Sequence, residues 1–328
     1  MKVLLIMPNF FGYPREIKEK LENLGYKVDL YDDRPSTNSV IKAVIRLKKN
    51  LLNVYIAAYF RKIISLTKRK KYDYVFFISG QSLSFSKEMM IELRNSQSQA
   101  KFVLYQWDSI KNFRNITEMY DIFDSCYTFD QSDTIKYKNL KFLPLFFSDR
   151  YEEIGKSTNK TCMYDFSFVG TAHPRKYRLV TEMADELRHV YSSDFVFFYY
   201  QSPLLFLYRK IFNKELRHAH YKEFNYTPLT EKQIINVISK SDIILDAPQD
   251  GQKGLTIRTI EALGAKKKLI TTNQEVKNYD FYRKENIYVY NGSFDFNDPF
   301  FNKPYKNLYE DTYKKYSLES WLLTILKN

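Results

Sequence analysis

The stretch from Ser241 to Asn273, SDIILDAPQDGQKGLTIRTIEALGAKKKLITTN, decides how the rest of the chain is interpreted. It starts with a short apolar run, Ile243 to Leu245, followed by polar residues and two glycines, a pattern typical of a strand and an open loop. Leu255 to Leu263 has a helical pattern that Gly264 is placed to end, and Lys268 to Thr272 resumes a strand. The stretch therefore predicts a strand, loop, helix and strand in a parallel α/β sheet.

The loop and helix start within this stretch predict an anion-binding site. Unpaired amides and the helix dipole point toward the carboxyl end of the preceding strand, where α/β proteins bind anions. Glu261 lies about two turns into the helix, where a carboxylate suits the vicinal hydroxyls of a ribose, and Arg258 precedes it by three residues. The alternative is that Glu261 is a solvated helix residue paired weakly with Arg258.

This segment resembles the nucleotide-sugar motif in the C-terminal domain of GT-B glycosyltransferases, where a glycine loop leads into a helix that ends Glu-Ala-x-x-x-Gly. It is similar in particular to the CgeB-like branch, whose members read roughly Gly-Leu-x-x-Arg-x-x-Glu-Ala-Leu. The residues that fit are Gly254, Leu255, Thr256, Arg258, Glu261, Ala262, Leu263 and Ala265, with Gly264 two places early. The resemblance implies a donor site made of Gly251, Lys253, Gly254, Leu255, Thr256, Arg258 and Glu261. Lys253 is a departure, because retaining families with a Glu-x7-Glu motif carry a glutamate there that contacts the donor sugar.

Length, charge and cysteine content limit the class of protein. A chain of 328 residues with 44% hydrophobic residues can form two domains of ordinary size, each with its own core. The net charge of +13 favours acidic partners, namely nucleotide diphosphates, anionic lipid surfaces or nucleic acid. Cys126 and Cys162 form neither a disulfide framework nor a metal-ligand pattern, so we expect a reducing compartment.

The N-terminus and the apolar windows bear on location. Met1 leads straight into a strand without a cleavage site, so no signal peptide is apparent. The longest apolar window, 51–60, is about half of what a bilayer span needs. We therefore expect a cytoplasmic protein that is soluble or peripheral on the inner face of the cell membrane.

Residues 1–150 are predicted to form a first Rossmann-like domain that would bind the acceptor. The loop after its first strand, PNFFGYP, has one glycine, Gly12, and is not a dinucleotide-binding fingerprint. In GT-B enzymes this loop faces the acceptor and the interdomain cleft, so the resemblance implies that Asn9 and Gly12 lie near the reaction site. An ordinary strand-to-helix turn is the alternative.

Asp108 is the candidate general base. It follows a predicted strand at 101–107, and the carboxyl ends of parallel strands carry the chemistry in α/β sheets. CgeB-like sequences also tend to carry an aromatic-acid cluster at this strand end. Capping of the turn before Lys111 is the competing role for Asp108.

The segment 41–71 carries the densest positive charge. From Arg34 to Tyr72, both included, the chain has eleven Lys and Arg and no Asp or Glu, and these cations are interleaved with aliphatic and aromatic residues in a helical pattern. One interpretation is an interfacial helix on an anionic membrane surface. The other is a crossover helix packed on the sheet with solvated lysines. No recognition motif accompanies the charge, so we expect no specific nucleic-acid partner.

The second half of the chain repeats the organisation of the first. The polar residues 148–163 predict a linker, and an apolar run at 164–170 predicts the first strand of a second sheet. We expect a nucleotide-sugar domain at 151–304 and a terminal helix at 305–328 that crosses back to the first domain, as it does in GT-B proteins. The expected fold is α/β, with two Rossmann-like domains facing across a cleft.

The loop that follows 164–170 is rich in basic residues. It resembles the GT-B loop that grips the donor diphosphate, which implies donor-binding roles for Gly170 and for Lys176 at the usual lysine. Arg175 or Arg178 would replace the arginine that is common at the position of Thr171. These charges would neutralise the leaving diphosphate.

Two further expectations concern the chemistry. His173 is a candidate catalytic base or phosphate contact, with an ordinary loop histidine as the alternative. No Asp-x-Asp at a strand end argues for a metal, so we expect metal-independent transfer without a cofactor beyond the donor.

The sequence thus predicts a hexosyltransferase-type enzyme. It would move a sugar from a nucleotide-diphosphate donor to a saccharide or lipid-linked acceptor in bacterial capsule, lipopolysaccharide or exopolysaccharide synthesis. Asp108 would activate the acceptor hydroxyl if the enzyme inverts. The alternatives are a sugar-nucleotide epimerase of the same double-Rossmann form and a non-catalytic membrane- or polymer-binding protein.

Overall fold

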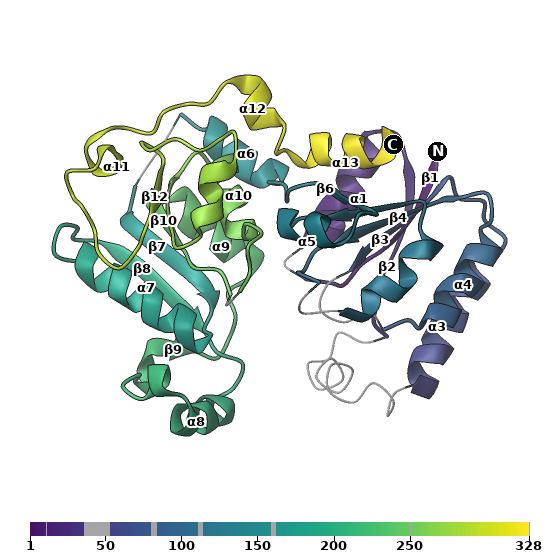
Figure 1. Cartoon of the computed structure of the whole chain (residues 1–328), viewed down its shortest axis with the longest axis horizontal. Helices are drawn as coiled ribbons and strands as arrows, with labels where there is room; N and C mark the ends of the chain where they lie inside the picture. Colours follow the sequence, from purple (N-terminus) through teal and green to yellow (C-terminus); the bar gives the residue numbers. More distant parts are fainter. Residues whose placement is uncertain are drawn as a thin grey trace. The chain divides into compact units, whose positions relative to one another are not determined.

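A computed structural model describes residues 1–10, 12–35, 53–79, 84–110, 114–158, 162–249 and 251–327. The chain divides into two compact units: unit 1 is Met1–Pro144 with Trp321–Asn328, and unit 2 is Leu145–Ser320. Each unit contains a six-stranded parallel sheet flanked by helices (Figure 1). The prediction of an α/β protein with two Rossmann-like domains is therefore confirmed.

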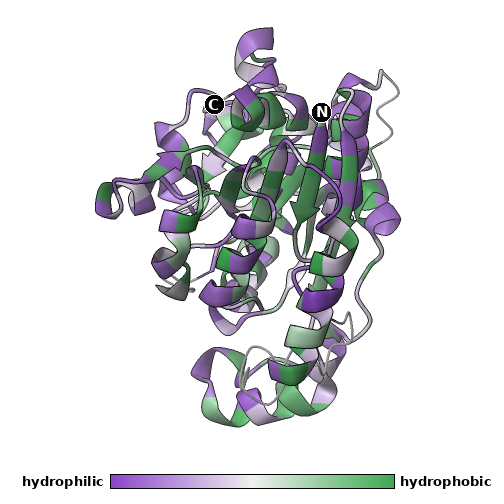
Figure 2. Cartoon of the chain, turned by 90° about the vertical axis from the view of Figure 1, so that its right-hand side faces the viewer, coloured by the Kyte–Doolittle hydropathy of each residue, from purple (hydrophilic) through white to green (hydrophobic). Residues whose placement is uncertain are grey.

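Unit 1 has the strand order β2-β1-β3-β4-β5-β6. The strands are apolar runs that become buried; β1, for example, reads KVLLI and buries its last four residues. Figure 2 shows the strands of this unit mostly in green, the colour of hydrophobic residues. The strands are β1 (Lys2–Ile6), β2 (Lys27–Tyr31), β3 (Tyr74–Ser79), β4 (Lys101–Gln106), β5 (Ser125–Thr128) and β6 (Leu140–Phe142), and the helices are α1 (Tyr13–Asn23), α3 (Asn53–Thr67), α4 (Lys87–Ser96), η2 (Arg114–Ile122) and α5 (Gln131–Lys136).

Unit 2 has the strand order β12-β11-β10-β7-β8-β9. Its strands are β7 (Tyr164–Thr171), β8 (Asp194–Tyr199), β9 (Phe224–Asn225), β10 (Ser241–Asp246), β11 (Lys268–Thr271) and β12 (Ile287–Val289). Its helices are α6 (Asp149–Lys156), α7 (Pro174–Leu187), α8 (Pro203–Phe212), η3 (Lys214–Leu216), η4 (Tyr221–Glu223), α9 (Glu231–Ser239), α10 (Ile257–Gly264), η5 (Gln274–Asn278), α11 (Pro299–Asn302) and α12 (Glu310–Lys314).

Both sheets change winding direction once. In unit 1 the chain passes from β1 to β2 on one side and then to β3 on the other side of β1. In unit 2 it passes from β7 to β8 and β9 and then returns to β10, which pairs with β7. The carboxyl ends of the strands at such a switch point form the crevice where α/β sheets bind ligands.

The last helix of the chain connects the units. α13 (Leu318–Lys327) begins in unit 2, and its residues from Trp321 onward belong to unit 1. The ring of Trp321 packs edge-on against Tyr105 of β4, with 4.7 Å between the ring centroids. The hydroxyl of Tyr74 in β3 donates a hydrogen bond to the carbonyl oxygen of Leu326 at 2.7 Å. The end of the chain is therefore part of the core of unit 1.

Two details of unit 2 differ from the sequence predictions. The predicted linker 148–163 is wrong over α6, which packs against α10. A Cβ atom placed on Gly155 of α6 would lie 2.4 Å from the carbonyl oxygen of Gly264. Gly264 does not follow the helix but is its last residue, and a Cβ there would lie 2.5 Å from Phe147. Gly155 therefore allows α6 to approach α10 closely, and Gly264 makes room for the side chain of Phe147, which precedes α6.

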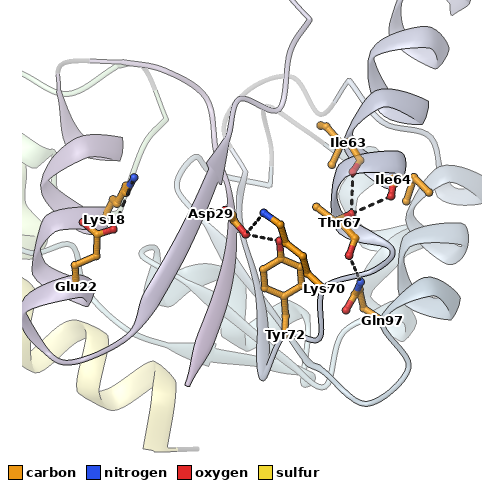
Figure 3. A network of polar contacts seen from close by, with 9 residues as sticks. All are labelled: Lys18, Glu22, Asp29, Ile63, Ile64, Thr67, Lys70, Tyr72 and Gln97. Carbon is orange, nitrogen blue, oxygen red and sulfur yellow. Dashed lines mark hydrogen bonds and ion pairs between the residues drawn. The ribbon is translucent and has the colours of Figure 1, made fainter.

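Asp29 links β2 to the segment after α3. Its carboxylate accepts hydrogen bonds from the Tyr72 hydroxyl at 2.5 Å and from the Lys70 ammonium at 2.9 Å (Figure 3). Burial alone would raise the pKa of Asp29, but the hydrogen bonds from Tyr72 and Lys70 outweigh it and lower that pKa. The folded state therefore favours the charged carboxylate.

Asp29→Asn is expected to destabilise the protein near neutral pH and to have little effect in acid. A carboxyl whose folded pKa is depressed contributes stability above its unfolded pKa, and this contribution is lost as the pH falls through the folded pKa. The partners are partly exposed, so we expect a loss of about 1 kcal/mol or less. Urea unfolding at both pH values measures it, with Glu22→Gln in the exposed Lys18–Glu22 pair as the control. An equal loss at both pH values would contradict this account.

Candidate functional site

The predicted donor residues gather at the carboxyl edge of the sheet in unit 2. β7 leads into the start of α7, and β10 leads into the glycine loop before α10. Because β7 and β10 are the paired strands at the switch point, these two loops lie where an α/β sheet binds its ligand.

The start of α7 presents backbone amides and two cationic side chains. His173 has an extended backbone (φ −102, ψ 150) and is the N-cap residue, its side chain does not cap the helix amides, and Pro174 occupies the first turn. The Tyr177 amide donates to the carbonyl oxygen of His173 at 2.8 Å. Helix amides ahead of the first bonded turn have no partner within the helix, so the amides of Arg175 and Lys176 lie at the positive end of the helix dipole.

Lys176 is half-buried at this helix start. Burial lowers the pKa of its ammonium, the carboxylate of Asp246 opposes this effect, and the charge of Arg258 adds to it. Asp246 is buried at the end of β10 and accepts hydrogen bonds from the hydroxyls of Thr259 at 3.3 Å and Thr271 at 3.2 Å. The three charged groups are thus coupled at the switch point.

Two pockets open at this edge. The first, which we call the α7 pocket, has a volume of 320 Å³ and is lined by His173, Pro174, Arg175, Lys176, Asn213, Glu215, Pro248 and Gln249. The second, which we call the glycine-loop pocket, has a volume of 210 Å³ and is lined by Arg175, Leu179, Pro248, Gln249, Gly251, Gln252, Lys253, Thr272, Asn273, Gln274 and Glu275. Arg175 lines both pockets.

The glycine loop is held from β11. Gly251 has a φ of 75, which favours glycine. The side-chain amide of Asn273 donates to the carbonyl oxygens of Lys253 at 3.1 Å and Gly254 at 3.4 Å. Sequence analysis missed this role of Asn273, although a polar residue just after a parallel strand is a usable signal.

The start of α10 is fixed by its own residues. The Thr256 hydroxyl accepts a hydrogen bond from the Thr259 amide at 3.3 Å and caps the helix. Leu255 is buried. These two residues therefore position the helix, whereas Gly251 and Lys253 line a pocket.

Glu261 and Arg258 form a buried ion pair. Their carboxylate and guanidinium lie 2.6 Å apart, and Glu261 is 4% exposed, so the alternative of a solvated glutamate is wrong. Tyr151 of α6 contacts the pair; burial raises the pKa of its hydroxyl well above the usual value, the charge of Glu261 adds to this, and Arg258 opposes it. Neither Glu261 nor Arg258 is among the described residues that line the two pockets.

Two other donor candidates have local partners. Arg178 pairs with Glu182 at 2.9 Å and Glu215 at 3.3 Å and is not among the described residues that line either pocket. A Cβ atom on Gly170 would lie 2.7 Å from the ring of Phe168. The packing of that ring is sufficient to explain glycine at this position.

In unit 1 the acceptor candidates meet through an aromatic cluster. The ring of Trp107, next to Asp108, lies 5.2 Å from Phe10 and 5.5 Å from Tyr13 between centroids. Phe10 and Tyr13 lie on either side of Gly12 in the sequence. Gly12 is the N-cap residue of α1 and has a φ of 78. The cluster therefore brings the loop after β1 next to the end of β4.

Asp108 and its loop are held by hydrogen bonds. An oxygen of Asp108 accepts a hydrogen bond from the amide of the next residue, Ser109, at 2.9 Å. The buried carboxyl of Asp133 accepts from the Ile110 amide and the Thr128 hydroxyl, both at 3.3 Å, and burial raises its pKa. Sequence analysis missed Asp133 as a positioning residue, and Lys111 lies outside the described residues.

A second buried carboxyl was also missed. Asp33, just after β2, is fully buried, and burial raises its pKa to about 8, while the charge of Arg34 opposes the shift. Its neighbour Asp32 accepts a hydrogen bond from the Asn9 amide at 3.3 Å. A titratable group therefore lies next to the residue that contacts the loop after β1.

The basic segment 41–71 is described from residue 53 onward; Lys42, Arg46, Lys48 and Lys49 lie outside the described residues. α3 buries Ile56, Phe60 and Ile63 in the core of unit 1, as a crossover helix does. No helix in the described part of the chain is long and apolar enough to cross a membrane. Within the same ranges, no three His, Cys, Asp or Glu side chains cluster as metal ligands.

Comparison with known proteins identifies the fold. No family model matches the chain, and no curated protein matches it in sequence. Among solved structures, Anabaena Alr3699/HepE in complex with UDP-glucose has a TM-score of 0.59 at 9% identity over 100% of this chain and 98% of that chain. The lipopolysaccharide outer core galactosyltransferase WaaB in its apo form has a TM-score of 0.56 at 12% identity over 100% and 99%.

A glycosyltransferase from Rickettsia africae has a TM-score of 0.54 at 15% identity over 100% of this chain and 93% of that chain. At these identities the likeness concerns the fold, which is GT-B. The CgeB-like branch is not singled out by these structures.

Proposed function

We propose that this chain is a glycosyltransferase that binds a nucleoside-diphosphate sugar at the carboxyl edge of unit 2. The observation that carries the proposal is the half-buried Lys176, which lines the α7 pocket at the switch point beside Asp246. The GT-B fold supports it, since structures of this fold include HepE with bound UDP-glucose and the galactosyltransferase WaaB. A uridine nucleotide is therefore the first donor to test.

The diphosphate would lie at the start of α7. Lys176 and Arg175 would contact its oxygens, together with the first helix amides. Charge develops on the diphosphate as the bond to the sugar breaks, and cations fixed in a half-buried site stabilise that charge more strongly than water does. Asp246 would hold the Lys176 ammonium in place. His173, in the same pocket, would be a phosphate contact or a base.

The glycine-loop pocket would receive another part of the donor. Gly251 and Lys253 line it, and Gly254, Leu255 and Thr256 set the start of α10 beside it. The roles of Glu261 toward the ribose and of Arg258 toward phosphate require these two side chains to separate on binding, because each is bonded to the other in the free protein.

The acceptor would bind on the side of Asn9 and Gly12, with Asp108 as general base if the reaction inverts configuration. We propose a saccharide or lipid-linked acceptor in surface polysaccharide synthesis, and contact of the segment 41–71 with an anionic membrane. The charge of that segment supports the membrane contact.

Release of nucleoside diphosphate from a panel of sugar nucleotides, with and without saccharide and lipid-linked acceptors, tests the proposal. Acceptor-dependent release with a glycosylated product is the expected result. An isomerised sugar nucleotide without transfer would instead identify an epimerase. Binding of glycans or vesicles with no response to any sugar nucleotide would identify a non-catalytic protein.

Removal of divalent metal is expected to leave the transfer rate within about twofold of its original value. Lys176 and Arg175 would supply the positive charge that stabilises the leaving diphosphate, a role that a bound metal ion has in other enzymes. Initial rates with excess chelator, before and after addition of Mg²⁺ or Mn²⁺, measure the effect. A rate abolished by chelator and restored by one of these ions would show that the cationic side chains are insufficient.

A further inference from the structure

The helix α8 carries a row of exposed apolar side chains that we call the apolar stripe: Leu204, Leu207, Tyr208, Ile211 and Phe212. They are between 51% and 79% exposed. Their spacing of three, four, seven and eight residues from Leu204 places them on one face of the helix. Among the other described elements, α3 has the most exposed large apolar side chains, with three. The stripe is therefore the largest apolar surface concentrated on one described helix.

α8 is firmly attached to unit 2 through its opposite face. Phe206 is buried, and its ring lies 4.8 Å from Phe224 and 5.6 Å from Tyr200 between centroids. The Ser202 hydroxyl accepts a hydrogen bond from the Leu205 amide at 3.1 Å and caps the helix. The Lys210 ammonium donates to the carbonyl oxygen of Ala219 at 2.7 Å. These contacts hold the helix so that its stripe points outward.

The charges around the stripe are mainly positive. From Pro203 to Lys222 the chain has five Lys and Arg and one Glu. Lys214, Arg217 and Lys222 are exposed. The one acid, Glu215, is paired with Arg178. An occupant of this surface must therefore combine apolar groups with negative charge.

We propose that α8 lies in the plane of an anionic membrane surface, with the apolar stripe inserted at the boundary between headgroups and acyl chains. Interfacial helices have this combination of an apolar face and flanking cations, and they need no length to span the bilayer. This contact is in unit 2 and is independent of any contact through the segment 41–71.

The position of α8 relates the membrane to the site. The segment that follows the helix contributes Asn213 and Glu215 to the lining of the α7 pocket. Docking of α8 would therefore bring the α7 pocket close to the lipid surface. A pocket close to the lipid surface favours a lipid-linked acceptor over a soluble saccharide. This inference about the acceptor rests on the proposed glycosyltransferase function.

Co-sedimentation of the full chain with vesicles tests the membrane contact. The vesicles contain phosphatidylcholine alone or with about one third phosphatidylglycerol. Wild-type protein is expected to bind the anionic vesicles and to leave the neutral ones mostly unbound. Replacing Leu204, Leu207, Ile211 and Phe212 together by serine is expected to weaken binding to anionic vesicles at least about tenfold.

A matched variant controls for the loss of exposed apolar residues as such. It carries Val54→Ser, Ile135→Ser and Val190→Ser, which replace side chains that are 82%, 84% and 57% exposed on other elements. It is expected to bind like wild type. A second variant, with Lys214, Arg217 and Lys222 changed to glutamine, is expected to lose binding to anionic vesicles and most of its salt dependence. Circular dichroism verifies that each variant is folded.

Several results would overturn the proposal. One is that the wild-type protein does not bind anionic vesicles. Another is a folded serine variant that binds them as wild type does, which would place the contact on another segment such as 41–71. A third is a wild-type protein that does not bind vesicles but forms a dimer, when the serine variant does not dimerise. The apolar stripe would then bind a second copy of the chain. The vesicle experiment contains no nucleotide, so a negative result in it does not bear on the proposal that the chain is a glycosyltransferase.

Discussion

Lys176→Ala is expected to lower kcat/KM for sugar transfer about 100- to 1000-fold, a loss of about 3 to 4 kcal/mol of transition-state stabilisation. Lys176 is the half-buried cation of the α7 pocket, and its ammonium lies in the field of Asp246. Removing it leaves the charge of the departing diphosphate less neutralised and Asp246 without its counter-charge. Steady-state rates over a range of donor concentrations measure the effect.

Two further variants make this prediction specific. Arg188→Ala removes a cation from the other end of α7, where the guanidinium pairs with Asp185 and Asp194, and it is expected to change kcat/KM by less than about threefold. Lys176→Arg keeps a positive charge but replaces a point charge with a planar fork, so it should retain part of the rate.

The pH dependence provides an independent readout. Since burial lowers the pKa of Lys176, its ammonium loses its proton at a lower pH than an exposed lysine does. Affinity for a diphosphate should fall as the pH rises through that pKa, and Lys176→Arg should remove the fall because guanidinium stays protonated. An unchanged pH profile in Lys176→Arg would assign the diphosphate contact to other residues.

Glu261→Ala is expected to destabilise unit 2 by about 3 to 5 kcal/mol, whether or not a nucleotide binds. The substitution removes the carboxylate that faces the guanidinium of Arg258, whose side chain is 16% exposed, and the buried hydroxyl of Tyr151. Such an uncompensated buried charge costs far more than the loss of an exposed ion pair. Denaturant unfolding of the full chain measures the loss.

An exposed pair on α7 provides the control for this second prediction. Glu182→Ala breaks the pair with Arg178, whose side chains are both more than 40% exposed, and should cost less than about 1 kcal/mol. The double variant Arg258→Met with Glu261→Met should be more stable than Glu261→Ala, because it leaves no buried charge. Equal losses in Glu261→Ala and Glu182→Ala would contradict the buried-pair account.

The predicted destabilisation makes Glu261→Ala a poor probe of the donor site. A loss of nucleotide binding in Glu261→Ala would follow from destabilisation as well as from a missing ribose contact. Glu261→Gln also leaves the charge of Arg258 unbalanced, but it keeps the side chain's size and an oxygen that accepts a hydrogen bond, so it should destabilise the protein less than Glu261→Ala. Lys176 is the better test of the donor site as a whole.

The α/β class and the two sheets could be predicted because parallel strands buried on both faces are near-continuous apolar runs. β1, β3 and β10 are such runs, and each is followed by a polar loop. The clustering of Lys176 with the loop after β10 could also be predicted, since both follow strands of one sheet at their carboxyl ends.

Other features depend on contacts that sequence pattern does not encode. α6 has a polar composition typical of a linker, yet it packs in unit 2, where Gly155 allows its close approach to the end of α10. Glu261 is buried because Tyr151 and Arg258 enclose it, and these residues come from two different helices. Asp33 lies between Asp32 and Arg34, and a run of charged residues would suggest an exposed loop. Its side chain is nevertheless buried, because of contacts that form only in the folded chain.

Calorimetric titration with UDP, GDP, ADP and CMP, on wild-type protein and on Lys176→Ala with Arg188→Ala in parallel, tests the central claim most directly. The account predicts that one nucleoside diphosphate binds selectively, that Lys176→Ala weakens it at least about tenfold, or about 1.4 kcal/mol, and that Arg188→Ala does not. If none of the nucleotides binds, or if Lys176→Ala binds as tightly as wild type, the carboxyl edge of unit 2 is not a diphosphate site of the kind proposed.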